Sequence, residues 1–453
     1  MIVIQSIINT ILVIFQIFLT VISIIYSQRK YHRWISPLSI YTSISSVSLL
    51  LCLMNLLSYT DIKTIVLFLL LLSEISLFFG VTFGDAIFNS VKGKTKRIQQ
   101  NEEDSHSLII KEVEIVRLSM SIIAIIATVG WTLSLREILR IYSLSYILAD
   151  TSFIQYMDLQ QQYIGYLNVM GILVFPMFVF CAFKDKVRIL DIICVCLAMT
   201  GLFLAGIKSY LIITLVVGFF VYSQIAPKIK FRYILLLAFA GIAFFVFYTN
   251  IIDKYSVVNF GGSNFPEFLS IFQRPYLYIT GGWASFSVAE ASTGTMFPYK
   301  GYVVLAPIFK LISFLGLTDK EQFEPLEGVQ ISSYGAGTNV YTMVGEAYID
   351  LGVVGCVFTF LFLGLICGYL YKLSCRYRKP NMIFVSALLM YVMFISFLNY
   401  YLNFKILFLC IVTYGVLKAV NFYKNKKRRR IIYRRKTTNE SRTFFRQQYH
   451  TIR

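Results

Sequence analysis

The chain has 453 residues, of which 57% are hydrophobic and only 14% are charged, and its mean hydropathy is +0.69. These values exclude an ordinary soluble domain, because about a quarter of the residues in such a domain are charged. The formal net charge of +19 would also suit a nucleic-acid partner, but basic residues have a second use at membrane surfaces. We therefore interpret the chain as a polytopic membrane protein.

Apolar stretches of about 20 residues, the length of a membrane-spanning helix, recur along almost the whole chain. The first stretch has no basic residue before it and no small-residue cleavage site after it, so a spanning helix is predicted there rather than a cleaved signal peptide. We predict one all-α bundle of eleven spanning helices, at residues 3–26, 35–57, 64–90, 116–135, 163–183, 189–207, 209–225, 233–248, 338–373, 381–401 and 404–421.

These spans divide the chain into four regions. About eight spans form an N-terminal bundle at residues 1–249, a large connection occupies 250–337, three more spans follow at 338–423, and a basic tail occupies 424–453. No internal repeat of fixed period is evident. The spacing of Gly364 and Gly368 is typical of close helix contacts, which we expect within the chain rather than between copies of it.

The orientation follows from basic residues, which gather in alternate connections and mark the cytoplasmic side. They lie at residues 29–33, 92–117, 184–188, 228–232 and 372–379 and in the tail. This pattern predicts a periplasmic N-terminus and a cytoplasmic C-terminus. The tail then acts as the stop signal of the last helix beside anionic lipid, and RNA binding is the less favoured interpretation.

Three of the predicted outer connections carry candidate residues. The first begins with Arg136 and Arg140 and is predicted to hold an interfacial helix. The second is a tight turn with Lys208, which either snorkels to headgroups or faces a lipid-linked diphosphate. The third is the large connection at 250–337, which we expect to cap a cavity, although a simple cover on the bundle is the alternative.

The large connection contains a basic and aromatic run from Arg274 through Tyr278 to a pair of glycines at 281 and 282. The glycines predict a turn, and the aromatic side chains suit the headgroup level. Further along, residues 303–317 predict a short interfacial helix interrupted by Pro307. Lys300 precedes this helix and adds a positive charge on the same side.

Polar side chains stand at the mouth of the long apolar segment that follows. At helical spacing Asn339, Glu346 and Asp350 form one stripe, whereas Tyr341 and Tyr348 lie on another. Because polar groups are costly in hydrocarbon, this stripe suggests a functional site. The simpler alternative is that Asn339 caps the helix and that the carboxylates face water or a neighbouring helix.

Metal and cofactor chemistry finds little support in the sequence. All eight cysteines lie in or beside apolar segments, and the three histidines lie in predicted cytoplasmic segments, so a zinc centre at the outer face is not expected. The chain has no Walker loop and no dinucleotide-binding glycine motif. We expect neither a metal nor another cofactor.

The segments Gly337-Thr-Asn-Val-Tyr-Thr and Tyr348-Ile-Asp-Leu-Gly-Val-Val-Gly resemble the signature of the O-antigen polymerases, the Wzy-type polymerases of oligosaccharide repeat units. The span number and the large late outer loop are similar too. Two departures are present. Lys208 stands where many relatives have an arginine, and position 285, eleven residues after Arg274, is serine where some relatives have glycine.

The resemblance implies a metal-independent glycosyltransferase with a GT-C-like bundle at the outer face of the bacterial inner membrane. It would transfer the growing chain from undecaprenyl diphosphate to the next lipid-linked repeat, with a chain-length regulator as a further partner. The expected roles divide into three groups. Arg274, Lys208 and Arg136 or Arg140 hold the diphosphate; Asp350 or Glu346 is the base; Asn339, Tyr341, Tyr348, Tyr278 and Lys300 bind the remaining substrate.

Two other classes remain open. In a transporter or flippase of lipid-linked oligosaccharide, Glu74, Asp85, Glu346 and Asp350 would be ion or proton sites. A ligase would need a different acceptor and commonly has an external histidine, which this chain lacks.

Overall fold

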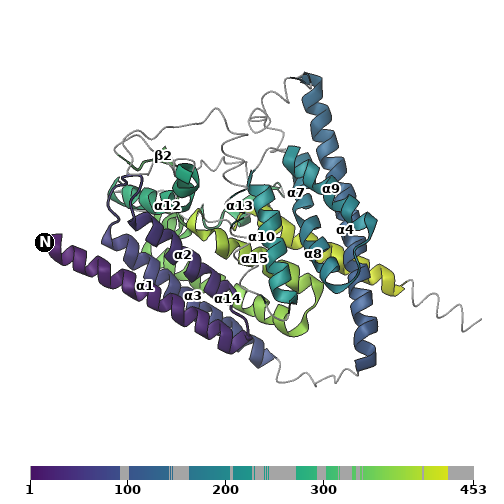
Figure 1. The fold of residues 1–453 in the computed structure, drawn as a ribbon, viewed down its shortest axis with the longest axis horizontal. Helices are drawn as coiled ribbons and strands as arrows, with labels where there is room; N and C mark the ends of the chain where they lie inside the picture. The colour runs from purple at the N-terminus through teal and green to yellow at the C-terminus, as the bar shows by residue number, and fades with distance from the viewer. Residues whose placement is uncertain are drawn as a thin grey trace, which may run out of the picture.

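The computed structural model is a helical, multi-pass membrane protein. It describes residues 2–91, 102–141, 163–204, 208–226, 272–292, 303–314, 329–332, 337–338, 340–399 and 402–426, and a few single residues between them. Figure 1 shows the helices in chain order. They are α1 (Ile2–Tyr31), α2 (Pro37–Leu53), α3 (Thr64–Val91), α4 (Glu102–Ile141), α7 (Tyr163–Val169), η3 (Met170–Leu173), α8 (Val174–Lys184), α9 (Ile189–Leu204), α10 (Lys208–Ile225), α12 (Gln273–Ser292), α13 (Ala306–Phe314), α14 (Met343–Tyr377), α15 (Pro380–Phe394) and η7 (Ile395–Phe397). A last helix, Phe404–Lys426, we call the C-terminal helix.

Seven helices of the described chain are long and apolar enough to cross a membrane, and α2, α9 and α10 are shorter apolar helices. Together they correspond to ten of the eleven predicted spans, and the eleventh, at 233–248, lies outside the described residues apart from single positions. The all-α class is confirmed, whereas the number eleven stays a prediction. Part of the 92–117 connection is helical, because α4 begins at Glu102.

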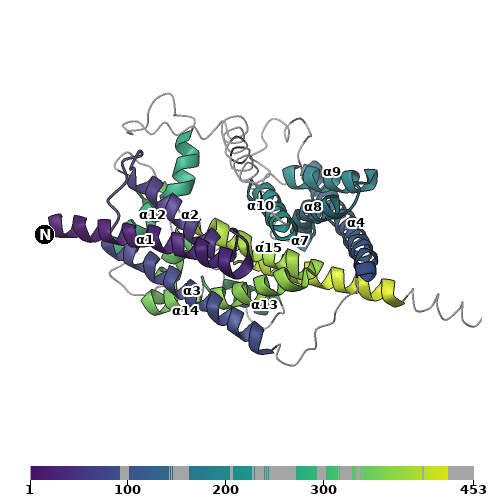
Figure 2. The ribbon, with the colours of Figure 1, turned by 60° about the horizontal axis from the view of Figure 1, so that its bottom comes forward.

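The helices pack as two groups joined by α15. One group contains α1, α2, α3, α12 and α14; the other contains α4, α7, α8, α9 and α10, and α15 contacts α2 and α14 on one side and α10 on the other. Both views place α1–α3 and α12 on one side of the molecule and α4, α8 and α9 on the other (Figures 1 and 2). α12 lies at the end of the bundle where α3 and α14 begin. We call this the α12 end.

The most extensive helix contact joins α3 and α14. Gly80 and Gly84 on α3 face Gly364 and Gly368 on α14, so each helix presents two small residues four positions apart. A Cβ atom added at Gly364 would stand 2.5 Å from the carbonyl oxygen of Leu77, and one added at Gly368 would stand 2.6 Å from that of Val81. Such backbone contact favours association of helices in lipid. The predicted use of Gly364 and Gly368 within the chain is therefore confirmed.

The large connection differs from its prediction around α12. The glycine pair does not form a turn but lies inside α12, where a Cβ at Gly282 would stand 2.7 Å from the carbonyl oxygen of Phe397. The aromatic residues divide: Tyr278 is 41% exposed, whereas Trp283 is 1% exposed and donates from its indole nitrogen to Ser48 Oγ at 2.9 Å. These glycines thus serve close packing of α12 into the bundle.

The rest of this connection adds a short helix and a minimal sheet. Pro307 does not interrupt α13 but stands in its first turn, where a missing backbone N–H costs nothing. Two short strands, β1 (Val329–Gln330) and β2 (Gly337–Thr338), pair antiparallel, with Val329 opposite Thr338. Tyr59 forms an isolated bridge with Ser332 and ties this hairpin to the connection between α2 and α3.

A buried arginine fixes α4 to the α8–α9 turn at the opposite end of the bundle. The Arg117 guanidinium donates to Asp185 at 2.5 Å and to Asp191 at 3.0 Å, and it also donates to the Lys186 carbonyl. The hydrogen bond from Arg117 holds the pKa of Asp185 below its usual value.

Exchanging Gly364 for alanine should destabilise the protein by about 1–3 kcal/mol, because the new methyl group meets backbone that has little room to move. The readout is the midpoint of thermal unfolding of purified protein in detergent. Gly415→Ala is the matched control, because a Cβ there meets nothing within 4 Å. Equal midpoints for the two variants would contradict the importance of the glycine contact between α3 and α14.

The ion pair of Asp185 should make stability depend on acid pH. Because the folded pKa lies below the unfolded one, the carboxylate stabilises the fold at pH values above the unfolded pKa, and this contribution is lost as the pH falls through the folded pKa. Thermal unfolding of the wild type and of Asp185→Asn, measured from pH 7 downward, should therefore converge below about pH 4. A midpoint difference that is constant with pH would argue against this linkage.

Candidate functional site

The first turn of α14 carries a carboxylate at the α12 end. Thr342 caps the helix by accepting a hydrogen bond from the Gly345 amide at 3.1 Å. Glu346 follows in the first turn and is 8% exposed. The positive end of the helix dipole favours a negative charge at this position. Glu346 thus lies at the capped start of α14, on the same segment as Asp350.

Asp350 lies one helical turn after Glu346, in a different environment. It is fully buried, and its Oδ2 accepts hydrogen bonds from the amides of Val303 at 3.1 Å and Val304 at 2.8 Å. These amides belong to the turn that leads into α13. Through these two hydrogen bonds Asp350 acts as a clamp that holds the turn before α13 to α14.

The helix breaks directly after Asp350. Gly352 has φ of 70° and ψ of −164°, outside the helical region and disfavoured for residues with a side chain. The segment with both carboxylates is therefore a short helix, set apart from the long part of α14 that packs on α3. Broken helices at membrane depth are common at binding sites, because the break frees backbone polar groups.

The two predicted sugar-binding tyrosines differ in exposure. Tyr341 is 3% exposed and packs with Ala289 and Ile349, so its ring is part of the core. Tyr348 is half-buried, with its ring centroid 5.7 Å from that of Phe286 on α12. Of the two, Tyr348 has the more accessible ring. Asn339 lies outside the described residues.

α12 meets α14 through its middle rather than through its first turn. Gly282 approaches the backbone of Thr342, and Phe286 lies against Gly345. Arg274 stands eight residues before Gly282, which corresponds to about 12 Å along a helix. Tyr278 lies between them and is 41% exposed. Arg274 and Tyr278 therefore share a helix with the residues that contact α14 but lie toward its start.

A pair of lysines forms a cationic region at the same end. Lys405, in the first turn of the C-terminal helix, donates to the Tyr210 hydroxyl of α10 at 2.9 Å. Lys310 of α13 stays accessible to solvent, yet desolvation and, second, the charge of Lys405 lower its pKa. Lys310 and Lys405 thus lie near enough for the charge of one to act on the other. Lys208 begins α10 two residues before Tyr210, although its side chain is not described.

The sequence analysis did not single out Lys405, which falls at the start of the predicted last span. A signal was present: Lys208, Lys310 and Lys405 each lie at or near one end of an apolar segment on the same predicted side. What the sequence could not supply was the proximity of Lys310 to Lys405. That proximity depends on α13, whose leading turn Asp350 holds.

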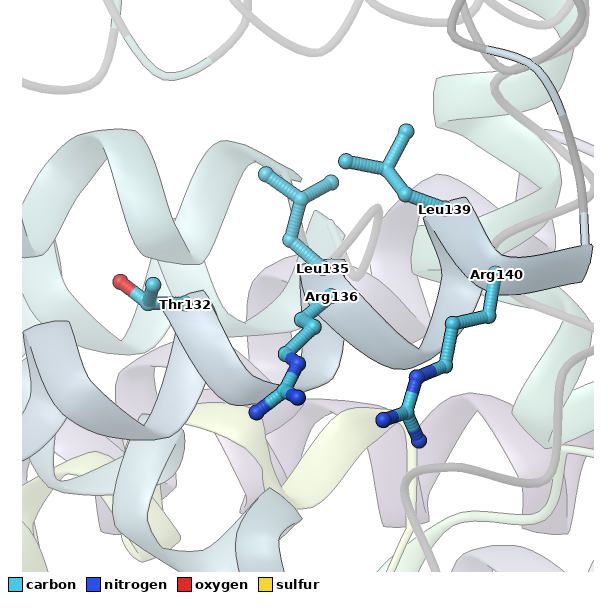
Figure 3. Close-up of a pocket in the computed structure, with 5 residues that line it drawn as sticks. All are labelled: Thr132, Leu135, Arg136, Leu139 and Arg140. Atoms are coloured by element: carbon cyan, nitrogen blue, oxygen red, sulfur yellow. The ribbon is translucent and has the colours of Figure 1, made fainter.

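The other predicted cations lie elsewhere. Arg136 and Arg140 are four residues apart on α4, and Figure 3 shows both pointing away from Leu135 and Leu139. They line an open groove of about 400 Å³, and Arg140 pairs with Glu137 at 3.0 Å. Because α4 and α12 occupy opposite sides of the molecule, these arginines belong to another surface (Figures 1 and 2). Lys300 lies outside the described residues.

The described residues contain no group of three or more histidine, cysteine or acidic side chains that could hold a metal ion. Residues 75–429 match the model of a family described as a family of unknown function, DUF6337. Because the match covers most of the chain, the protein belongs to this family. Searches of the curated proteins and of the solved structures gave no match. The matched region includes Glu346, Lys310 and Lys405.

Replacing Asp350 with alanine should release the turn before α13. The amides of Val303 and Val304 lose a charged acceptor, a change that costs about 1.5–3 kcal/mol for each such hydrogen bond. Hydrogen–deuterium exchange of residues 303–314 should accelerate at least about tenfold. Glu137→Ala on α4 is the control and should leave this exchange unchanged. Equal protection of these residues in the wild type and in Asp350→Ala would contradict the role of Asp350 in holding this turn.

Proposed function

We propose that this member of the DUF6337 family polymerises lipid-linked oligosaccharide repeat units at the outer face of the bacterial inner membrane. The α12 end is then periplasmic, and the basic tail is cytoplasmic. The growing polymer leaves undecaprenyl diphosphate and joins the next lipid-linked repeat of O-antigen or of a related surface polysaccharide. The observation that supports this most is the lysine pair Lys310 and Lys405, which α13 links to the carboxylate segment of α14.

The spacing along α13 suits a lipid-linked sugar. Val304 is held by Asp350, and Lys310 follows six residues later, which corresponds to about 9 Å along a helix. A diphosphate at Lys310 and Lys405 would therefore place its attached sugar toward α14. The polyprenyl tail would remain in the bilayer, beside the apolar outer surface of the surrounding helices.

The reaction needs one bond formed and one broken. The acceptor hydroxyl oxygen attacks the anomeric carbon of the growing chain, while the bond from that carbon to the diphosphate oxygen breaks. Glu346 takes the proton of the hydroxyl, and Lys310 and Lys405 stabilise the charge on the departing diphosphate. Tyr348 offers its accessible ring to a sugar. Arg274 and Lys208 remain proposed as further contacts to the diphosphate, and the scheme includes no metal.

A second candidate function is transport of the lipid-linked oligosaccharide across the membrane. The observation that favours it is the break at Gly352 beside Asp350, because transporters place discontinuous helices at their substrate sites. The two functions predict different cells after deletion of the gene. Loss of a polymerase leaves a single repeat on lipid A core, whereas loss of a flippase leaves none.

Polymerisation can be tested with purified protein and a synthetic diphosphate-linked repeat, with and without a chelator. Glu346→Gln should lower the rate by about 10²–10⁴-fold, because the amide cannot accept the proton. Lys405→Met should lower it by about 10²–10³-fold, since it removes a charge that stabilises the leaving group. Lys405→Arg should restore part of the activity.

The controls for these variants lie on the same chain. Lys418→Met changes a cation 13 residues further along the C-terminal helix, about 20 Å away, and should retain activity. Full polymer length with both Lys310→Met and Lys405→Met would overturn the leaving-group site. Normal polymer in cells with Arg274→Ala and with Lys208→Ala would remove these two residues from it.

A further inference from the structure

A carboxylic acid lies near the middle of α3, far from either end of the helix. Glu74 stands ten residues after Thr64, which corresponds to about 15 Å along the helix, and it is 1% exposed. It faces Gln16 of α1 and Ser46 of α2, which are 2% and 5% exposed. Three helices thus enclose it at a depth where hydrocarbon surrounds the bundle.

Two side-chain oxygen atoms of Gln16 and Glu74 lack a hydrogen-bond partner. The Gln16 side-chain amide donates to Glu74 Oε1 and to Ser46 Oγ, the latter at 3.2 Å. Ser46 also shares a hydrogen bond of 2.7 Å with Thr20. Gln16 Oε1 and Glu74 Oε2 are buried and have no hydrogen-bond partner. If Glu74 is ionised, both atoms are acceptors, so they cannot satisfy each other.

The surroundings of Glu74 do not compensate a negative charge. α1 contributes Gln16 and Thr20, and α2 contributes Ser46 and the Tyr41 hydroxyl, which pairs with Ser73 Oγ at 2.8 Å. On the α14 side, Phe360 lies against Tyr41. Among the described residues, no lysine, arginine or histidine pairs with Glu74. An unpaired carboxylate at this depth costs several kcal/mol.

We propose that Glu74 is a proton-binding site that holds its proton as a neutral carboxylic acid paired with the Gln16 amide. A proton on Oε2 makes that atom a donor, and its natural acceptor is Gln16 Oε1. One added proton therefore satisfies both leftover atoms and closes a ring of two hydrogen bonds between α1 and α3. The ring accounts for a buried acid without any cation beside it.

The ring has a structural consequence for α1. Only 11% of the apolar window of α1 is buried, so polar contacts such as this one and that of Tyr31 with Asp85 contribute to holding the helix on the bundle. A neutral pair in hydrocarbon is stabilising, whereas removing its proton would leave a charge with no partner and would weaken the contact. Because the site lies away from Glu346 and Lys405, the inference is independent of the proposed polymerase activity.

Infrared spectroscopy of the full-length protein in lipid nanodiscs tests the proton directly. With ¹³C-labelled glutamate, the wild type should have a protonated carboxylic acid band that is absent in Glu74→Gln. This band should persist from about pH 5 to about pH 9, well above the ordinary glutamate pKa. Glu137→Gln is the matched control: Glu137 is exposed, so its replacement should remove a carboxylate band and leave the acid band unchanged.

Thermal unfolding supplies a second measurement. Glu74→Gln is neutral and of the same shape, so its midpoint should stay close to that of the wild type, while Glu74→Ala and Gln16→Leu should lower it. Loss of only a carboxylate band in Glu74→Gln at neutral pH would overturn the proposal. So would a midpoint that rises with Na⁺ but not with choline, if Glu74→Gln abolishes that rise, because a metal cation would then occupy the site.

Discussion

The backbone contact between α3 and α14 is the constraint on which the rest of the bundle depends. Four glycines let the two helices approach until the carbonyl groups of one meet the Cα atoms of the other. In lipid there is no hydrophobic drive to bring helices together, so close packing has to supply it. The contact fixes α14 as the scaffold on which Glu346 and Asp350 are presented, and it fixes α3 as the scaffold that holds Glu74 against α1.

Asp350 fixes part of the large connection at 250–337, whose structure hydropathy alone does not predict. By accepting two backbone hydrogen bonds, it determines where the turn before α13 lies and hence where Lys310 can reach. Asp350 thus fixes the position of α13, which carries Lys310, relative to the start of α14, which carries Glu346. Its burial is explained by these contacts, since a carboxylate without donors would be costly in the same place.

The spans were predictable because hydrocarbon imposes one rule, long apolar helices, on every segment that crosses it. The sequence analysis was wrong at α12, where the glycines at 281 and 282 predicted a turn. They lie inside the helix instead, and Gly282 packs against the backbone of Phe397 and Thr342. Lys405 was also missed, because nothing in a single sequence relates it to Lys310. Glu346 and Asp350 lie on one helix as predicted, but the hydrogen bonds that hold Asp350 come from the amides of a segment more than forty residues earlier.

The break at Gly352 has a consequence for how the two acids are positioned. Beyond the break, α14 is anchored to α3 along its length, whereas the preceding turns are tied mainly to α12 and to the α13 turn. Gly352 thus separates the short segment that carries both acids from the long part of α14, so the acids are positioned by other contacts than those that hold this long part to α3.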